Sequence, residues 1–329
     1  MTSAQSFVDL KPGADALERH RIAVLVPCYN EENSIGKVVA DFRAALPQAP
    51  VYVYDNNSRD RTVEVAQRAG AVVRREQHQG KGHVVRRMFT DVEADIYVLV
   101  DGDATYDAPS VRTMISRLLE QRLDMVVAAR VDREKAAYRT GHRTGNRLLT
   151  SFVAMVFGRT FSDMLSGYRV FSRRFVKSFP VLSGGFEIET ELTVHALELE
   201  LPVGEVETPY YARLAGSTSK LNTWRDGLRI LWTIIRLYRS ERPLQFFSAI
   251  GAVLAIVSIV LAIPIVTTFL REGVVPRFPT AILSTGLMLS ALLSFMSGLI
   301  LDTVTRGRRE LKLLAYLAHR APGADRRQA

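Results

Sequence analysis

The stretch YVLVDGDATYD, residues 97–107, runs from four apolar residues directly into two carboxylates that stand two positions apart. A short apolar run bounded by turn residues is typical of a buried strand. Because residues i and i+2 of an extended chain point the same way, Asp101 and Asp103 can direct both carboxylates at one point. Gly102 between them would let a ligand approach the backbone closely. The stretch therefore predicts a buried strand that ends in a pair of ligand-binding acids.

Similar apolar runs lie on both sides of this strand, and segments with helical spacing separate them. We expect strands over residues 22–27, 51–54, 71–75, 96–100 and 125–129, and helices over residues 34–46, 61–69, 83–93 and 110–122. Strands that alternate with helices predict an α/β fold with a largely parallel sheet covered on both faces, and such sheets bind ligands beyond the carboxyl ends of the strands. The polar segments that follow three of these strands are PCYNEE, DNNSRD and DGDATYD. We therefore expect their acids to converge on one edge of the sheet.

Two carboxylates at one point supply hard oxygen ligands, which Mg²⁺ or Mn²⁺ accepts together with a diphosphate. Three competing motifs fail. An EF-hand loop that began at Asp101 would need Gly in place of Tyr106, GKGHVV lacks the third glycine of a dinucleotide fingerprint, and Gly82 after Lys81 excludes a P-loop. On the residues alone, a divalent-cation site and a solvated turn after a buried strand remain open alternatives.

The C-terminal part of the chain differs sharply in composition from the rest. No charged residue occurs in residues 244–270 or 278–301. Each run is long enough to cross a hydrocarbon core of about 30 Å at about 1.5 Å per helical residue. A buried helical hairpin is the alternative, but soluble proteins rarely join two such runs by a loop as short as REGVVPRFP. We therefore predict two transmembrane helices in an integral membrane protein.

Positive residues are more numerous at the outer ends of the two runs than in the loop between them. Arginines and a lysine precede the first run and follow the second, whereas the connecting loop has only Arg271 and Arg277. The positive-inside rule therefore predicts that both termini are cytoplasmic, at the plasma membrane if the source is a prokaryote. The first 20 residues lack the apolar core of a signal peptide, and the lone Cys28 cannot form an internal disulfide. The formal charge of +9 gathers next to the spans, which fits anionic lipid better than nucleic acid.

Residues 222–239 place aromatic and aliphatic side chains at helical spacing among four arginines. This pattern predicts an amphipathic helix that lies in the membrane interface, with docking on the soluble domain as the alternative. The chain then divides into an N-terminal extension (1–20), an α/β domain (21–221), a juxtamembrane helix (222–243), two spans (244–302) and a basic tail (303–329).

Six segments in a fixed order resemble glycosyltransferase family 2, and within it the polyprenyl-phosphate glycosyltransferases of the dolichyl-phosphate mannose synthase type. They are VPCYNEE, YDNNSRDRT, GKG, VDGDATYD, SGYRVF and RLAGSTSKL, which together cover roughly residues 22–221. The two apolar C-terminal runs match the members with several spans. The resemblance implies an A-type glycosyltransferase fold, a nucleotide-sugar donor such as a UDP- or GDP-hexose, and undecaprenyl or dolichyl phosphate as the acceptor.

The resemblance also implies roles for single residues on the donor side. It assigns the metal ion and the donor diphosphate to Asp101 and Asp103. The residues that it places against the donor are Pro27, Tyr29, Asn30, Glu31, Asp55, Lys81, Asp101 and Arg130. For Glu31 a stabilising role at a helix N-terminus is an alternative, and Lys81 could instead be an exposed loop cation. The second strand of such enzymes commonly ends in two acids, whereas Asn56 and Asn57 follow Asp55 here, which leaves the base open.

Cations past the sheet are implied to bind the acceptor phosphate, and these are Arg143, Arg169, Arg213 and Lys220. Arg139, Arg143 and Arg147 are spaced by four, so on one helical face they would repel one another unless an anion relieves them, although a solvated face is the usual meaning of such a run. The resemblance gives the catalytic roles to Asp101, Asp103, Arg143 and Arg169. The segment GFEIETELTVHA, with Glu187, Glu189 and His195, resembles a family segment near the acceptor, and core or surface roles for the three are equally open.

We therefore predict an inverting, membrane-bound glycosyltransferase that makes a lipid-linked sugar for cell-envelope or protein glycosylation. One alternative is a processive polysaccharide synthase, which the absence of a Gln-x-x-Arg-Trp segment and the presence of only two apolar runs disfavour. Another is a non-catalytic membrane protein that binds nucleotide sugars, which the intact acids at positions 101 and 103 disfavour.

Small residues recur every four positions in the second span, at Gly286, Ser290, Ser294 and Gly298. Such a ridge lets another helix approach closely. The partner is either the first span or another subunit, and we expect the ridge to help build a homo-oligomer, either a dimer or a tetramer.

Overall fold

The structure is a computed structural model that describes residues 19–132, 161–181, 184–185, 187–213 and 238–323, with residues 232, 235 and 236 between the last two ranges. The chain forms two compact units. The sheet unit comprises Met1–Gly227 and Lys312–Ala329, and the hairpin unit comprises Leu228–Leu311.

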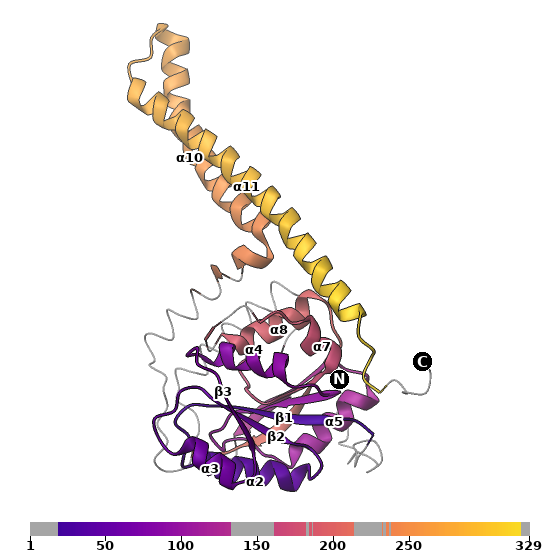
Figure 1. The fold of residues 1–329 in the computed structure, drawn as a ribbon. Coiled ribbons are helices and arrows are strands. Elements are labelled where there is room, and N and C mark those ends of the chain that lie inside the picture. Colours follow the sequence, from indigo (N-terminus) through magenta and orange to yellow (C-terminus); the bar gives the residue numbers. More distant parts are fainter. Residues whose placement is uncertain are drawn as a thin grey trace. The chain divides into compact units, whose positions relative to one another are not determined.

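The sheet unit contains a seven-stranded sheet in the order β3-β2-β1-β4-β6-β5-β7 (Figure 1). Its strands are β1 (Ile22–Cys28), β2 (Val51–Asp55), β3 (Val72–Arg75), β4 (Ile96–Leu99), β5 (Met125–Asp132), β6 (Arg169–Ser172) and β7 (Val203–Tyr210). Strand β6 runs antiparallel to its neighbours β4 and β5, and the other paired strands are parallel. The predicted largely parallel sheet is confirmed, including the five strands expected from the sequence.

Helices cover both faces of this sheet (Figure 1). On one face lie α2 (Ile35–Ala45), α3 (Thr62–Arg68) and α5 (Ser110–Glu120). On the other lie α4 (Lys81–Asp91), α7 (Arg173–Ser178) and α8 (Ile188–Glu198). The four helices expected from the sequence correspond to α2, α3, α4 and α5, each with an apolar stripe toward the sheet, as in α5, which buries Val111, Met114, Ile115 and Leu118.

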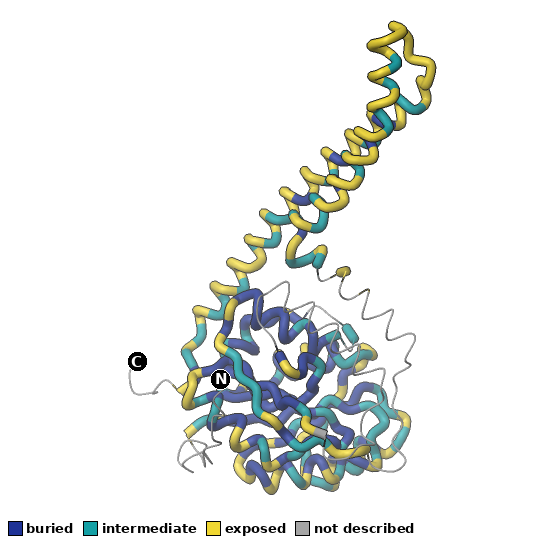
Figure 2. Tube along the Cα trace, turned by 180° about the vertical axis from the view of Figure 1, so that it is seen from behind, coloured by how far each residue is buried: buried dark blue, intermediate teal, exposed yellow. Residues whose placement is uncertain are grey.

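The core lies between these layers, and it fixes the edge of the sheet at which the polar loops emerge. Strand β1 is buried along almost its whole length, as expected of a central strand covered on both faces. On the α4 side, the Phe171 ring stacks on Phe175 at a centroid distance of 4.8 Å and meets the Phe89 ring edge-on at 5.9 Å. Figure 2 shows the interior of the sheet unit mainly in the colour of buried residues, whereas the edge strands β3 and β7 are mostly exposed or half-buried. The loops beyond β1, β2 and β4 therefore start from rigid strand ends.

The hairpin unit contains two helices, α10 (Pro243–Glu272) and α11 (Phe278–Leu317), that are long and apolar enough to cross a membrane. Only 17% of the most apolar window of α10 and 11% of that of α11 are buried, so Figure 2 shows both helices mainly as exposed. Helix α10 begins with a proline and ends before Gly273, which adopts the left-handed conformation common after helix ends (φ 71°). Helix α11 continues well past the predicted span end at residue 301, into the predicted basic tail.

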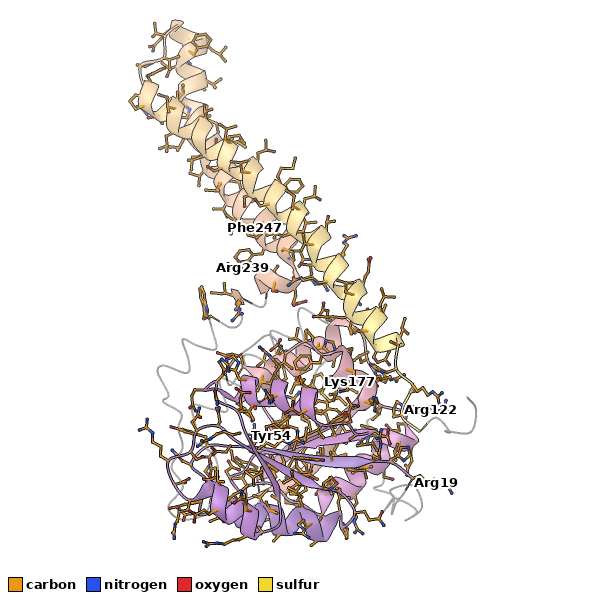
Figure 3. The ribbon with its side chains drawn as sticks, viewed as in Figure 1. Arg19, Tyr54, Arg122, Lys177, Arg239 and Phe247 are labelled. Atoms are coloured by element: carbon orange, nitrogen blue, oxygen red, sulfur yellow. The ribbon has the colours of Figure 1, made fainter. Side chains whose placement is uncertain are left out.

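Small residues form the seam between the two long helices. Ser258 Oγ donates to the Ser284 carbonyl at 2.7 Å, and Ser284 Oγ donates back to the Ser258 carbonyl at 3.0 Å. A Cβ on Gly298 would lie 3.0 Å from the Cβ of Phe247, which is labelled in Figure 3. The buried residues Ser284, Ala291 and Gly298 recur at the seven-residue interval of a coiled-coil seam.

The predicted ridge of small residues divides between two faces of α11. Gly298 packs on α10, and Ser294 Oγ donates to the Phe247 carbonyl at 2.9 Å. Gly286 has no atom within 4 Å of an added Cβ, and Ser290 Oγ bonds within its own helix to the Gly286 carbonyl. Half of the ridge therefore serves the hairpin itself, and the homo-oligomer stays a prediction. Most of the predicted juxtamembrane helix lies outside the described residues.

Candidate active site

The loops after β1 and β2 are joined by hydrogen bonds between backbone and side chains. The Asn30 N–H donates to Ser58 Oγ at 2.9 Å and the Glu31 N–H donates to Thr62 Oγ1 at 2.8 Å. In return, the Arg59 N–H donates to Asn30 Oδ1 at 2.8 Å. Asn30 has a φ of 52°, a conformation that Asn tolerates better than most residues. The segments YNEE and NNSRD, which are distant in sequence, therefore form one wall at the carboxyl edge of the sheet.

Asp55 ends β2 beneath this wall and is fully buried. Its carboxylate oxygens accept from the Ser58 N–H at 3.2 and 3.3 Å, and Arg75 Nε lies 3.5 Å from Oδ2. Pro27 and Tyr29, which the resemblance also places against the donor, lie partly exposed at the end of β1. These residues share the edge of the sheet on which the sequence predicts the donor.

Asn56 stands where the resemblance leads us to expect a second acid. Its side chain bonds to the backbone of the loop before α4. Its Nδ2 donates to the carbonyls of Glu76 and His78 at 3.0 and 2.8 Å, and its Oδ1 accepts from the Gly80 N–H at 2.7 Å. A carboxylate could not donate those two bonds. The amide at position 56 therefore holds the loop that leads into α4.

Lys81, the first residue of α4, bridges two acids from different elements. Its Nζ lies 2.5 Å from Asp101 Oδ1 and also forms an ion pair with Glu189 at the start of α8. Burial disfavours the charge on Lys81, but Asp101 and Glu189 outweigh it and raise the pKa of Lys81 above its ordinary value. The side chain is only 11% exposed, so the alternative of an exposed loop cation does not apply.

The preceding residue, Gly80, fixes where Lys81 starts. Its φ of 134° is a conformation that residues with a side chain rarely adopt, and a Cβ there would lie 2.0 Å from the Gly184 carbonyl oxygen. Gly80, the first glycine of GKG, therefore allows the loop before α4 to lie against the segment before α8.

Asp103 is held on both oxygens. Oδ1 accepts from Thr105 Oγ1 at 2.7 Å, and Oδ2 forms an ion pair with Arg213 Nη2 at 2.8 Å. Burial and the nearby charge of Asp101 raise the pKa of Asp103, while Arg213 and Thr105 act in the opposite direction. Arg213 follows β7, whose end is bound to the DGDATY loop because the Tyr211 N–H donates to the Thr105 carbonyl at 2.9 Å. The two predicted metal ligands are therefore each paired with one cation, Lys81 or Arg213.

Two glycines fix the position of these acids. The Gly102 carbonyl accepts from Ser34 Oγ at 2.7 Å, and a Cβ on Gly102 would lie 2.7 Å from Cys28 Sγ. Packing against Cys28 therefore leaves no room for a side chain here, and the close ligand approach expected from the sequence stays a prediction. A Cβ on Gly167 would lie only 2.2 Å from Asp101 Oδ2, so Gly167 forms the surface on which that carboxylate rests.

Arg169 does not fit its predicted contact with the acceptor phosphate. The side chain is fully buried, and it donates to the carbonyls of Ser166 and Met164 at 2.9 and 2.5 Å and to Thr193 Oγ1 at 2.9 Å. Burial lowers the pKa of Arg169 to about 10. Its nitrogens are thus occupied within the core, where they hold the loop that contains Gly167.

Arg130, at the carboxyl end of β5, is bound to Asp163 by two hydrogen bonds of 2.5 and 2.8 Å and lies over the Tyr210 ring at 5.3 Å. Arg143 and Lys220 lie outside the described residues.

Of the residues whose role the sequence left open, Glu189 joins the cluster through Lys81. His195 is a core residue, because it is buried beside Phe175 and Phe179, and burial lowers its pKa to about 3. Glu187 precedes the first turn of α8.

Asp101 and Asp103 fit a divalent cation that a ligand helps to coordinate. Both are carboxylates on one tight loop, and each has a cationic partner, Lys81 or Arg213, that a metal ion would displace or compete with. Among the described residues, no group of three or more His, Cys, Asp or Glu side chains forms a closed metal site. A hard cation at this pair would therefore take further oxygen ligands from a bound diphosphate or water, as Mg²⁺ and Mn²⁺ commonly do.

Comparisons with known proteins agree with this arrangement. Residues 23–179 match the model of the family described as Glycosyl transferase family 2. The glycosyltransferase AglJ of Haloferax volcanii is 36% identical over 70% of this chain and 76% of its own length. The dolichyl-phosphate hexose transferase of the same organism is 27% identical over 67% of this chain and 95% of its own length.

A solved structure with the same fold is glucosyl-3-phosphoglycerate synthase from Mycobacterium tuberculosis, in complex with Mn²⁺, uridine diphosphate and phosphoglyceric acid. It has a TM-score of 0.55 and 20% sequence identity, and the match covers 68% of this chain and 79% of that one. The fold is therefore the A-type glycosyltransferase fold, and with a 36% identical relative matched over 76% of its length, this chain belongs to glycosyltransferase family 2.

Proposed function

We propose that this glycosyltransferase transfers a hexose from a UDP- or GDP-sugar to polyprenyl phosphate on the cytoplasmic face of a membrane. The observation that carries the proposal is the Asp101-Gly102-Asp103 loop, which lies at the carboxyl edge of the sheet between the cations Lys81 and Arg213. A related protein is named a dolichyl-phosphate hexose transferase, and this chain adds two helices apolar enough to span a membrane.

The donor would lie along the wall formed by the loops after β1 and β2. Asn30 and Glu31 belong to this wall, and the carboxylate of Asp55 lies beneath it, where it can accept hydrogen bonds from the base or ribose. Uracil and guanine both present N–H donors, so either base satisfies this carboxylate.

Asp101 and Asp103 would hold the divalent cation, Mg²⁺ or Mn²⁺, against the donor diphosphate. When bound, the ion would neutralise the charge that builds up on the departing nucleoside diphosphate. Lys81 keeps Asp101 in position through a short ion pair, and Gly167 supports the same carboxylate from behind.

The acceptor would supply its own nucleophile. A phosphate monoester has a second pKa near 6 and is therefore anionic at neutral pH, so the enzyme need not remove a proton from it. Attack on the anomeric carbon from the face opposite the leaving diphosphate inverts its configuration. The protein must instead offset the repulsion between two anionic substrates, and Arg213 is suited to this because it reaches Asp103, one of the two proposed metal ligands. Arg143 and Lys220 are proposed for the same task from the sequence.

We also propose that α10 and α11 cross the bilayer and that both chain termini are cytoplasmic. The arginine bias of the sequence supports this orientation. The contacts of Lys312 and Tyr316 with Glu198 and Asp124 support only the same-side placement of the two ends, because the chain after the two helices packs on the sheet unit again. An even number of crossings satisfies both observations.

A turnover assay with radiolabelled donor tests the proposal most simply. The purified full chain in detergent is incubated with Mn²⁺, UDP- or GDP-hexoses and a membrane lipid extract, and the product is separated on thin layers. A lipid-soluble product with one sugar supports the proposal. A growing polymer indicates a processive synthase, and donor binding without any product indicates a non-catalytic binding protein.

The proposed homo-oligomer has its own test. Gly286 and Ser290 lie on the part of α11 that does not contact α10. We expect Ser290→Leu to shift the protein toward monomer in mild detergent, measured by light scattering. Ser294→Leu should instead disturb the hairpin, because Ser294 bonds to Phe247 of α10. A wild-type monomer would contradict the oligomer.

A further inference from the structure

The end of the chain belongs to the sheet unit. From Lys312 onward, the last turns of α11 and the residues after it group with the sheet unit. We call residues 312–323 the tail segment. Lys312 Nζ binds Glu198 Oε2 at 2.6 Å, Tyr316 OH donates to Asp124 Oδ2 at 2.8 Å, and Pro322 is buried. The tail segment therefore contacts the sheet unit at several points along its length.

Tyr316 adds a hydrogen bond to the carboxylate of Asp124, which is fully buried. Asp124 lies directly before β5 and accepts two hydrogen bonds from Arg174, at 2.5 and 2.8 Å, and one from Ser172 Oγ at 2.6 Å. The Arg174 guanidinium lies 4.6 Å over the Tyr316 ring. Burial, together with the bond to Asp124, raises the pKa of Tyr316, so its hydroxyl stays a donor. Since a buried carboxylate needs all its partners, Asp124 holds the tail segment firmly.

One helix connects this docking point to the candidate active site. Glu198, the partner of Lys312, is the last residue of α8, and Glu189, the partner of Lys81, lies in its first turn. Ten of the 11 residues of α8 are buried, so the helix is packed on nearly every side. At about 1.5 Å per residue, the two glutamates are separated by about 14 Å of rigid helix. Thr193, between them, accepts a hydrogen bond from the buried Arg169.

We propose that the tail segment is a strap that positions α8, so that Glu189 holds Lys81 against Asp101. Without Lys312, the Glu198 carboxylate, which is only 7% exposed, would lack its cation, and an uncompensated buried charge is costly enough to shift its helix outward. An outward shift of α8 would withdraw Glu189 from Lys81. Glu189 and Lys312 are thus positioning residues. The functional consequence rests on the proposed function, which assigns Asp101 and Lys81 to the donor.

Reversal of the Lys312–Glu198 ion pair tests the strap. The full chain in detergent is compared as wild type, Lys312→Glu, Glu198→Lys and the double charge swap, by hydrogen–deuterium exchange without donor. We expect each single variant to exchange about fivefold faster in residues 187–191 and 81–85, and the swap to return both segments to the wild-type rate. Helix α3 should be unchanged, because a positioning role is local whereas a loss of global stability is not.

An ion pair earlier on the same helix provides the matched control. Arg306 Nη2 lies 2.8 Å from Asp302 Oδ2, and the Arg306 side chain is 77% exposed. Arg306→Glu, Asp302→Lys and their swap should leave both segments at the wild-type rate. If Lys312→Glu does not fold, Tyr316→Phe removes a single hydroxyl from the same docking surface, and we expect it to accelerate exchange in both segments by about twofold.

Three results would overturn the strap. One is wild-type exchange at residues 81–85 in the single variants and in Tyr316→Phe. Another is faster exchange confined to the end of α8 next to the substitution, and the third is a swap that stays as fast as the single variants. Donor titration by calorimetry then separates the two proposals. A wild-type chain that binds no nucleotide sugar refutes the proposed function and leaves the exchange result intact, whereas donor affinity lost in Lys312→Glu and regained in the swap supports both.

Discussion

A buried carboxylate lies at each end of the strands of the sheet, Asp103 at the carboxyl end and Asp124 at the amino end. The two carboxylates are held in different ways. Asp124, before β5, is fully buried and accepts from Arg174, Ser172 and Tyr316 within the protein. Asp103, beyond β4 at the opposite edge, has Thr105 on one oxygen and, on the other, Arg213, whose side chain is 35% exposed. A carboxylate whose partners are largely shielded from solvent holds the fold together, whereas one whose cation is more exposed can exchange that cation for a ligand.

The largest effect is expected when Asp103, whose cation Arg213 is partly exposed, is neutralised. We expect Asp103→Asn to lower transfer by about a hundredfold to a thousandfold, because the proposed metal ion would lose a carboxylate ligand. The melting temperature should not fall, since burial and Asp101 already raise the pKa of Asp103 and so disfavour its charge in the folded state. Rates with Mn²⁺ and calorimetric unfolding measure both effects. An active Asp103→Asn enzyme would remove the proposed role of this acid.

The same substitution at the other edge should have the opposite outcome. Asp124→Asn leaves Arg174, whose side chain is only 15% exposed, without its counter-ion, and we expect the free energy of unfolding to fall by about 3 kcal/mol. Denaturant unfolding of the purified chain measures it. A loss as small as that of a surface substitution would show that Asp124 does not hold the tail segment and the sheet together.

The parallel sheet and the acid pair could be predicted from the sequence. The antiparallel strand and the partners of single side chains could not, because they depend on contacts between residues that are distant in the chain. The alternating runs and the DGD loop predicted the parallel sheet and the acid pair, because both signals are local. Strand β6 has only four residues and no periodicity, so nothing local indicated an antiparallel strand there. The pairing of Lys81 with Glu189 links residues 108 positions apart. Arg169 was predicted as a phosphate ligand, because a sequence does not distinguish an arginine that binds core carbonyls from one that faces a ligand.

Substitution of Arg213 tests whether the cation beside Asp103 can be exchanged for a ligand. Arg213→Gln removes the cation beside Asp103, so Mn²⁺ should bind up to about fivefold more tightly in the absence of donor. Transfer to polyprenyl phosphate should nevertheless fall by about thirtyfold in kcat/KM for the acceptor, with donor affinity little changed. Manganese binding is followed by electron paramagnetic resonance.

Arg68→Gln is the control for a lost charge, because Arg68 is 76% exposed and pairs with Glu64 on α3, away from the acids. Equal effects of the two substitutions on manganese binding would show that net charge is responsible, rather than competition at Asp103. Loss of donor binding in Arg213→Gln would place this arginine with the donor instead of the acceptor.

The effect of pH should be smaller and should follow the acceptor. Transfer should fall by up to about tenfold per pH unit below about pH 6, as the acceptor phosphate dianion takes up one proton and becomes a monoanion. Lys81 should stay charged throughout, because Asp101 and Glu189 raise its pKa. Initial rates from pH 5 to 8 with saturating donor measure the profile, and a flat profile across pH 6 would mean that the acceptor need not be a dianion.

The most direct test of metal-dependent transfer to polyprenyl phosphate compares two acceptors that differ only in the phosphate group. Purified enzyme with Mn²⁺ and radiolabelled donor is given polyprenyl phosphate or the free polyprenol of equal length, each also with excess chelator. The proposed function predicts a lipid-linked sugar from polyprenyl phosphate with Mn²⁺ alone. Equal product from the free polyprenol, or undiminished transfer in chelator, would contradict it.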